Sequence, residues 1–271
     1  MIRRTSLILL LIVSSSCNKV DFSAAETIAF GHAGEGIRNG RNKFPPNTLE
    51  SINYIFENTT IDGAEIDVQM TKDSQLVVYH DFELSENSDA TGCIPNMNWS
   101  ELQNVKVYKT DLKISKLSDV LSIALAQDKM LYLDVKYLND CSGEFVNFQT
   151  FNNSLNQVLD PYSNQQKENI IINATSLSLI QSITDTSLIK SLETDNFVNI
   201  LSVLVNNDIQ VLTTKLKSIN DQQIQSIQEV NKKVCLYQLY TSAENKEAIR
   251  NKADYIITDK VGCAAQLLNG K

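Results

Sequence analysis

Three carboxylates and one lysine stand on two predicted strands, where together they could hold a cation. Glu65 and Asp67 alternate with apolar residues in Ala64–Gln69, and a second predicted strand repeats the pattern with Asp134 and Lys136. Side chains alternate along a strand, so the polar members of each pair share one face. Gathering three carboxylates costs much free energy without counter-charge, and Lys136 supplies only one positive charge. A divalent cation with oxygen ligands is therefore predicted, with a salt-bridged polar layer as the alternative.

Both histidines of the chain fall beside these carboxylates. His32 is predicted at the end of the first strand, and His80 at the end of the strand that follows Asp67. A lone histidine is more often structural than catalytic, but here both lie at predicted strand ends. Imidazole suits proton transfer near neutral pH, so the pair predicts acid–base catalysis.

The elements that must position these residues follow the pattern of parallel βαβ units, in which short β-branched runs alternate with helical stretches. Nine strands are predicted, at Thr27–Gly31, Ala64–Met70, Leu76–Tyr79, Met130–Lys136, Asn169–Ala174, Leu188–Leu192, Gln210–Thr213, Val234–Tyr240 and Tyr255–Thr258. The link around Lys72-Asp73-Ser74 between the second and third strands is far too short for a parallel crossover, which takes a dozen or more residues. The third strand is therefore predicted to be an antiparallel hairpin partner.

Eight parallel strands remain, the number that closes a (β/α)₈ TIM barrel, and about 250 residues is the usual size of that fold. No internal repeat or low-complexity segment indicates a second domain, so one barrel is predicted over residues 27–271. Near Trp99, the only tryptophan, a helix is predicted to begin with Ser100 as its cap. Catalytic residues of such barrels lie at the carboxyl ends of the strands, where the carboxylates and histidines would meet.

Composition excludes several classes of protein. The 271 residues are 42% hydrophobic and 21% charged, which suits one large core and not a disordered chain. The net charge of −8 gives no basic surface for a nucleic acid. A small-molecule substrate is the expected partner, and no protein partner is implied.

The N-terminal segment predicts export. Two arginines precede an apolar run from Leu7 to Val13, which is too short to span a bilayer, and small residues then lead into Cys17. This arrangement resembles a bacterial lipoprotein box, although Ser14 stands where Leu is usual. We expect a signal peptide over residues 1–16, a tether over 17–26 and a lipid on Cys17, anchoring the protein at the outer membrane or cell surface. A periplasmic or secreted protein and an uncleaved anchor are the alternatives.

Export also permits disulfide bonds. If Cys17 carries lipid, Cys93, Cys141, Cys235 and Cys263 remain. The pair Cys93–Cys141 is predicted because both residues lie in segments beyond strand ends. Four unpaired thiols are the alternative.

Six segments between about residues 27 and 259 resemble the glycerophosphodiester phosphodiesterases. They are Ile28–Gly34, Pro45–Leu49, Gly63–Asp73, Leu76–Asp81, Leu133–Lys136 and Asp254–Asp259, and the stretch from Glu65 to Asp81 is the most specific. The resemblance implies a TIM barrel that uses one divalent metal, Ca²⁺ or Mg²⁺, and two histidines. It implies cleavage of glycerophosphodiesters such as glycerophosphocholine, the head-group products of lipid metabolism, to glycerol phosphate and an alcohol.

The same resemblance assigns roles to individual residues. It makes Glu65, Asp67 and Asp134 the metal ligands, His32 and His80 the acid–base pair, and Lys136 a phosphate contact. Asp134 stands where Glu is commoner in the family, so its carboxylate is one methylene shorter.

Two further positions depart from the family pattern in one corner of the site. Ala33 stands where an arginine usually contacts phosphate, and Pro46 stands where Glu is usual. Between them runs a glycine-punctuated loop, Gly34–Lys43. Arg38 and Arg41 in this loop are predicted to replace the missing arginine, because guanidinium groups bind phosphate oxygens bidentately. Such a replacement would shift the preference away from glycerophosphocholine, whereas two solvated surface charges would not.

Other function classes stay open at this point. A barrel without the usual Arg and Glu could bind a phosphodiester at the cell surface without cleaving it. Spider-venom phospholipases D and phosphatidylinositol-specific phospholipases C resemble the family, so a lyase that forms a cyclic phosphate is also possible. A glycoside hydrolase could use paired carboxylates but would leave the histidines and Lys136 unexplained.

Overall fold

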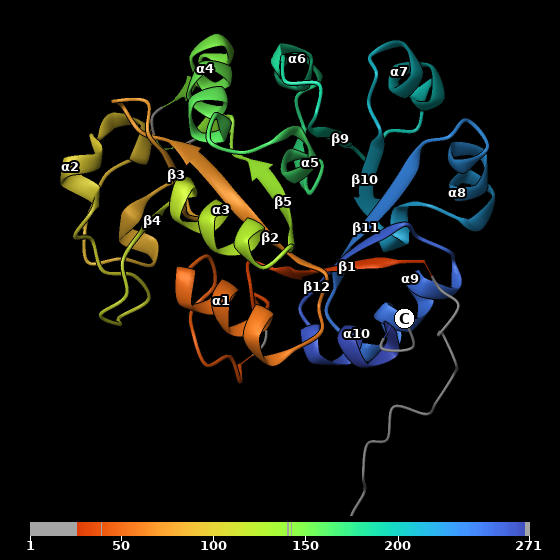
Figure 1. Cartoon of the computed structure of the whole chain (residues 1–271), viewed down its shortest axis with the longest axis horizontal. Helices are drawn as coiled ribbons and strands as arrows, with labels where there is room; N and C mark the ends of the chain where they lie inside the picture. The colour runs from red at the N-terminus through yellow and green to blue at the C-terminus, as the bar shows by residue number, and fades with distance from the viewer. Residues whose placement is uncertain (1–25, 39, 140, 142, 269–271) are drawn as a thin grey trace, which may run out of the picture.

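Eight parallel strands form a closed barrel, as predicted (Figure 1). The computed structural model describes residues 26–268 except 39, 140 and 142. Around the barrel the strands are β1 (Ile28–His32), β2 (Gly63–Met70), β5 (Met130–Val135), β8 (Ile170–Ala174), β9 (Ile189–Glu193), β10 (Val211–Lys215), β11 (Lys233–Leu239) and β12 (Tyr255–Thr258). The barrel closes because β1 pairs in parallel with both β2 and β12. This is a TIM barrel.

The helices lie outside the strands (Figure 1). They are α1 (Leu49–Asn58), α2 (Trp99–Leu102), α3 (Leu117–Ala126), α4 (Phe148–Leu159), α5 (Asn164–Lys167), α6 (Leu177–Ser182), α7 (Ile200–Asn206), α8 (Asp221–Gln228), α9 (Ser242–Arg250) and α10 (Val261–Leu268). None of the helices in the described part of the chain has the length and hydropathy needed to cross a membrane. The predicted signal peptide, Cys17 and the tether up to residue 25 lie outside the described residues.

Two layers of apolar side chains hold the barrel together. The larger layer lies between strands and helices and includes Ile66 and Val68 of β2 and Leu133 and Val135 of β5. The smaller layer fills the barrel interior, where Phe30, Tyr132 and Tyr255 pack together. Because apolar residues of β2 and β5 face the helices, the alternating Glu65, Asp67 and Asp134 face inward.

A glycine permits the close approach of three strands near the start of β2. A Cβ on Gly63 would lie 2.4 Å from the carbonyl oxygen of Met130 and 2.8 Å from the ring of Phe30. Any other residue would force these strands apart.

The predicted hairpin partner leaves the barrel after β2. Strand β3 (Leu76–Val78) pairs antiparallel with β2, and β4 (Ser115–Lys116) pairs antiparallel with β3. The excursion between β3 and β4 contains α2 and the 3₁₀ helices η1 (Leu84–Glu86) and η2 (Ile94–Asn96). It has its own core, in which the buried side chains are Val77, Tyr79, Leu84, Ile94, Leu102, Val105, Val107 and Ile114.

The cap of α2 differs from the prediction. Asn98, not Ser100, precedes the helix, and its N–H donates to Glu101 Oε2 at 2.8 Å in a capping box. The helix begins at Trp99, so Ser100 already lies inside the first turn.

The predicted disulfide is present and joins two excursions. Strands β6 (Leu138–Asn139) and β7 (Glu144–Phe145) form a small hairpin after β5. Cys141 in this hairpin is bonded to Cys93 in the excursion after β3, which confirms the pairing. Cys235 is buried inside the barrel and makes no disulfide.

Candidate active site

A cavity of about 340 Å³ lies at the carboxyl ends of the barrel strands. Its walls carry nearly all of the polar residues that the sequence singles out, together with others that it does not. The lining residues are His32, Ile37, Arg38, Glu65, Asp67, His80, Tyr132, Asp134, Lys136, Asn173, Glu193, Thr213, Tyr237, Gln238, Tyr240 and Ile257. Of the predicted catalytic, metal and phosphate residues, only Arg41 is not among them.

The three predicted metal ligands lie together. Strand register places Asp67 directly beside Asp134, while Glu65 lies one inward-facing position earlier on β2. One oxygen from each of the three carboxylates lies within 4.8 Å of the others. Hard oxygen donors at this spacing suit a divalent cation such as Ca²⁺ or Mg²⁺.

Lys136 lies against two of these carboxylates. Its Nζ is 2.7 Å from Asp67 Oδ1 and 2.6 Å from Asp134 Oδ2. The lysine thus forms part of the salt-bridged layer considered as the alternative to a metal site. One ammonium leaves excess negative charge among three carboxylates, so the salt bridges to Lys136 do not exclude a bound cation at the same cluster.

The loop before α1 fixes the remaining oxygen of Asp67. Asn47 Nδ2 donates to Asp67 Oδ2 at 2.6 Å, and the Asp67 N–H donates to Asn47 Oδ1 at 3.0 Å. Asn47 adopts a φ of +58°, which asparagine tolerates better than most residues. The following Thr48 caps α1, so the helix start holds this turn in place.

Burial and crowding shift the pKa values of the carboxylates. Burial, reinforced by the charge of Asp67, raises the pKa of Glu65 to about 8. Burial would also raise the pKa of Asp67, but Lys136 and the nearby histidines outweigh it and lower that pKa to about 2. Negative charge in the cluster is therefore compensated at Asp67 and under-compensated at Glu65.

Each histidine is held through Nδ1 by an aspartate. His32 Nδ1 lies 2.8 Å from Asp259 Oδ1, and His80 Nδ1 lies 2.8 Å from Asp81 Oδ1. In both rings Nδ1 faces the aspartate, and Nε2 of His32 lies 3.9 Å from Glu65 Oε2. This arrangement orients each imidazole and leaves Nε2 for proton exchange.

The aspartates also change how the histidines hold a proton. Burial alone would lower the pKa of His32, but the hydrogen bond to Asp259 and the charge of Glu65 raise it to about 9. The hydrogen bond to Asp81 raises the pKa of His80, against a smaller opposing effect of burial. Both rings are therefore biased toward the protonated form.

The loop after β1 folds over the cavity and is fastened to Asp259. The N–H groups of Ile37 and Arg38 donate to Asp259 Oδ1 and Oδ2, each at 3.0 Å. Gly36 has a φ of +101°, and a Cβ there would lie 2.7 Å from the backbone of Asp259, so this approach requires glycine. The Arg38 guanidinium then lies over the ring of Tyr240, 4.3 Å from its centroid.

Comparison with protein-family models identifies the chain. Residues 38–263 match the model of the glycerophosphoryl diester phosphodiesterase family. The chain belongs to this family. Because the match spans well over half of the chain, the resemblance carried by its motifs is confirmed.

Two curated relatives match over shorter stretches. A protein of Bacillus subtilis described as uncharacterized is 30% identical over 105 residues, which are 36% of this chain and 43% of that protein. A glycerophosphodiester phosphodiesterase of Bacillus altitudinis is 32% identical over 66 residues, which are 24% of this chain and 26% of the relative. These alignments therefore span less than half the length of either relative.

Solved structures of the family share the fold over nearly the whole chain. A phosphodiesterase of Oleispira antarctica, in complex with the product sn-glycerol-3-phosphate, superposes with a TM-score of 0.76 at 17% identity, covering 92% of this chain and 99% of that one. A glycerophosphodiester phosphodiesterase of Thermotoga maritima gives a TM-score of 0.70 at 20% identity, covering 89% and 98%.

Within this family, the first departure concerns the position after His32. Ala33 is fully buried with a φ of +51°, and its N–H donates to Glu65 Oε2 at 3.0 Å. The residue thus contributes its backbone to the carboxylate cluster and no side chain to the cavity. Arg38, five residues further on, lines the cavity, whereas Arg41 does not; both side chains are exposed.

Among the cavity residues without a role assigned from the sequence, Asn173, Glu193 and Tyr237 form one hydrogen-bonded group. Asn173 Nδ2 donates to Asp134 Oδ1 at 3.0 Å and to Glu193 Oε2 at 3.3 Å, and Tyr237 Oη donates to Glu193 Oε1 at 2.8 Å. Burial, with the charge of Asp134, raises the pKa of Glu193. Asn173 could have been found as the single polar residue inside an apolar strand, and Glu193 was missed because the predicted strand stops at Leu192.

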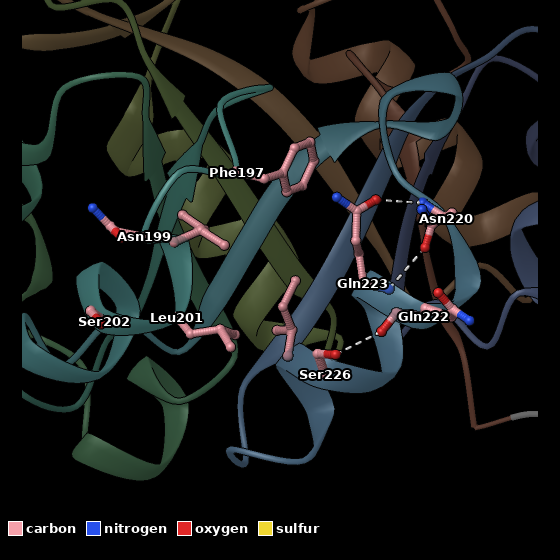
Figure 2. Close-up of a pocket in the computed structure, with 10 residues that line it drawn as sticks. Phe197, Asn199, Leu201, Ser202, Asn220, Gln222, Gln223 and Ser226 are labelled. Carbon is pink, nitrogen blue, oxygen red and sulfur yellow. Dashed lines mark hydrogen bonds between the residues drawn. The ribbon is translucent and has the colours of Figure 1, made fainter.

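A larger cavity of about 590 Å³ lies elsewhere, between α7 and α8 (Figure 2). Its walls combine apolar side chains such as Phe197 and Leu201 with the neutral polar residues Asn220 and Gln223, which form the capping box of α8. None of its lining residues is an acid, a base or a thiol. It therefore lacks the groups that phosphodiester cleavage requires.

Proposed function

We propose that this protein is a metal-dependent phosphodiesterase that hydrolyses glycerophosphodiesters to glycerol phosphate and an alcohol. The observation that carries the proposal is the meeting of three inward-facing carboxylates and two aspartate-bound histidines in one cavity. Membership of the phosphodiesterase family supports the same reaction class.

Glu65, Asp67 and Asp134 would hold the cation, since their oxygens fit the donor preference of Ca²⁺ or Mg²⁺. When bound, such a cation supplies Lewis-acid polarisation of the phosphate oxygens. The backbone N–H of Ala33 and the side chains of Asn47 and Asn173 hold the three carboxylates in place.

The two histidines supply the proton transfers. One imidazole takes the proton from the attacking oxygen, and the other gives a proton to the departing alcohol. Asp259 and Asp81 stabilise the imidazolium form of His32 and His80, respectively, through Nδ1. By holding Nδ1, each carboxylate also fixes the orientation of its imidazole ring, which leaves Nε2 for proton exchange.

Lys136 and Arg38 provide positive charge for the phosphate. Lys136 is fixed by Asp67 and Asp134, so its ammonium adds a charged donor at the carboxylate cluster. Arg38 approaches from the loop after β1, where stacking on Tyr240 limits its motion. In this proposal Arg38 takes over the phosphate contact that Ala33 cannot make.

Turnover of purified protein tests the proposal. We expect release of glycerol phosphate from glycerophosphocholine or a related diester in the presence of Ca²⁺ or Mg²⁺, and loss of that activity with a chelator. Binding of the diesters without turnover would instead identify a surface binding protein. A cyclic phosphate product, visible by ³¹P NMR, would identify the lyase route.

We also propose that the enzyme works outside the cytoplasm, attached to a membrane by lipid on Cys17, where it would process head groups released from phospholipids. The Cys93–Cys141 disulfide supports export, since such bonds persist in oxidising compartments. Metabolic labelling with palmitate should mark the wild-type chain and not Cys17→Ser. An unlabelled wild-type protein in the soluble fraction would contradict the anchor.

A further inference from the structure

We propose that Glu193 is a specificity-determining residue that selects phosphodiesters whose alcohol arm carries a positively charged nitrogen. The inference rests on the proposed function and names the substrate class of that same cavity. It arises from the one cavity-lining carboxylate that belongs neither to the metal set nor to a histidine pair.

Neutral hydrogen bonds fix Glu193 in the wall. Tyr237 Oη donates to Oε1 at 2.8 Å and Asn173 Nδ2 donates to Oε2 at 3.3 Å. Both donors are uncharged, so they orient the carboxylate without cancelling its charge. Each oxygen keeps a further lone pair for a ligand.

The other cavity carboxylates have basic partners. Asp67 and Asp134 contact Lys136, and Glu65 lies 3.9 Å from His32. Among the described residues, no basic side chain comes within 4.0 Å of Glu193. Arg38, the other cation of the wall, lies over the ring of Tyr240. Lys136 and Lys215 act on Glu193 only from beyond ion-pair distance. A partly buried carboxylate without a direct ion pair favours a cationic ligand group.

The position of Glu193 suits the alcohol arm of the substrate and not its phosphate. Strand β9 lies four strands around the barrel from β1, with β2, β5 and β8 between them. Asn173 on β8 donates to both Asp134 and Glu193, so the two carboxylates occupy adjoining parts of one wall. A diester whose phosphate lies at Asp134 and Lys136 would extend an arm toward Glu193.

The chemistry of the arm follows from these groups. An ammonium group can donate N–H hydrogen bonds to the Glu193 oxygens, and a trimethylammonium group gains only the charge attraction. A neutral glyceryl arm gains neither a charge interaction nor a full charge-assisted bond. We therefore expect the preference to fall in the order glycerophosphoethanolamine, glycerophosphocholine, glycerophosphoglycerol.

Binding calorimetry in a slow-turnover background tests this order independently of catalysis. The three diesters are titrated, with Ca²⁺ present, into His80→Ala and into His80→Ala carrying Glu193→Gln. The isosteric amide removes the charge, so we expect roughly 10- to 100-fold weaker binding of glycerophosphoethanolamine, a smaller loss for glycerophosphocholine and less than about a two-fold change for glycerophosphoglycerol.

Two matched variants serve as controls. Glu229→Gln removes an exposed carboxylate at the end of α8 and should leave all three affinities unchanged. Tyr237→Phe removes only the hydroxyl that orients Glu193, so it should give a smaller loss with the same head-group order.

The outcomes separate this inference from the proposed function. Equal losses for all three diesters, or no loss for any, would overturn the role of Glu193. Wild-type protein that binds diesters in the expected order without cleaving them would refute the hydrolase and leave the inference standing. Absence of binding by every diester would contradict both.

Discussion

The carboxylate of Asp259 accepts a hydrogen bond from Nδ1 of His32 at 2.8 Å, although 227 positions separate the two residues in the sequence. The same carboxylate accepts the N–H groups of Ile37 and Arg38. One side chain therefore orients a histidine of the proposed acid–base pair and also anchors the loop that carries Arg38.

Replacing Asp259 should impair turnover while the barrel stays folded. Asp259→Asn keeps the shape but removes the charge, and its amide cannot accept from all three donors at once. We expect kcat to fall at least roughly ten-fold, and less than the roughly 10²- to 10⁴-fold fall expected for His32→Ala. Steady-state kinetics of both variants, with thermal unfolding as the check on folding, measure this. Wild-type kcat in Asp259→Asn would show that His32 needs no orienting partner.

Asp81 should set the pH at which His80 loses its proton. The carboxylate raises the pKa of His80 because it stabilises the charged imidazolium. In Asp81→Asn the pKa should fall, so the limb of the pH profile of kcat/KM that reports His80 should move to lower pH. NMR titration of the His80 ring measures the same shift without activity. Because the chain has two histidines, the His32→Ala variant identifies which ring signals belong to His80. A limb that stays in place or moves to higher pH would contradict this pairing.

Removal of Asp67 should abolish tight binding of the divalent cation. Asp67 supplies one of three clustered carboxylates, and its loss leaves two ligands with Lys136 beside them. Isothermal titration with Ca²⁺ and Mg²⁺ should give binding by the wild type and none measurable for Asp67→Ala. Asp111→Ala, which changes an exposed carboxylate that does not line the cavity, is the control. Undiminished binding by Asp67→Ala would place the cation elsewhere.

The two loop arginines should differ in effect. Both arginines are exposed, but Arg38 lines the cavity and Arg41 does not, so the pair forms a matched comparison. We expect Arg38→Ala to lower kcat/KM roughly ten-fold or more through loss of a charged hydrogen bond to phosphate, and Arg41→Ala to change it less than about two-fold. Equal effects would remove Arg38 from phosphate binding.

The inward-facing carboxylates could be predicted because strand periodicity is a local property. Alternation in β2 and β5 requires Glu65, Asp67 and Asp134 to share the face opposite to Ile66 and Leu133, whatever the rest of the chain does. Loop length then predicted the barrel. The link after β2 is too short for a parallel crossover, so β3 is an antiparallel partner and eight of the nine predicted strands remain parallel.

Residues whose roles depend on tertiary contacts could not be found in the same way. Asn47 reaches Asp67 from a turn with a positive φ, which no periodic pattern indicates. Glu193 directly follows the predicted strand Leu188–Leu192 and resembles a loop residue, although it is the last residue of β9. The excursion after β3 has no regular period, so its separate core could not be anticipated.

The disulfide between Cys93 and Cys141 makes a closed covalent ring within the chain. Asp134 and Lys136 lie inside this ring, whereas Glu65, Asp67 and both histidines lie outside it. A single proteolytic cut anywhere between Cys93 and Cys141 would therefore leave the enzyme in one covalent piece until the bond is reduced. The part of the excursion that follows Cys93 can thus be nicked without separating the two halves of the carboxylate cluster, whereas a cut between β3 and Cys93 would separate them.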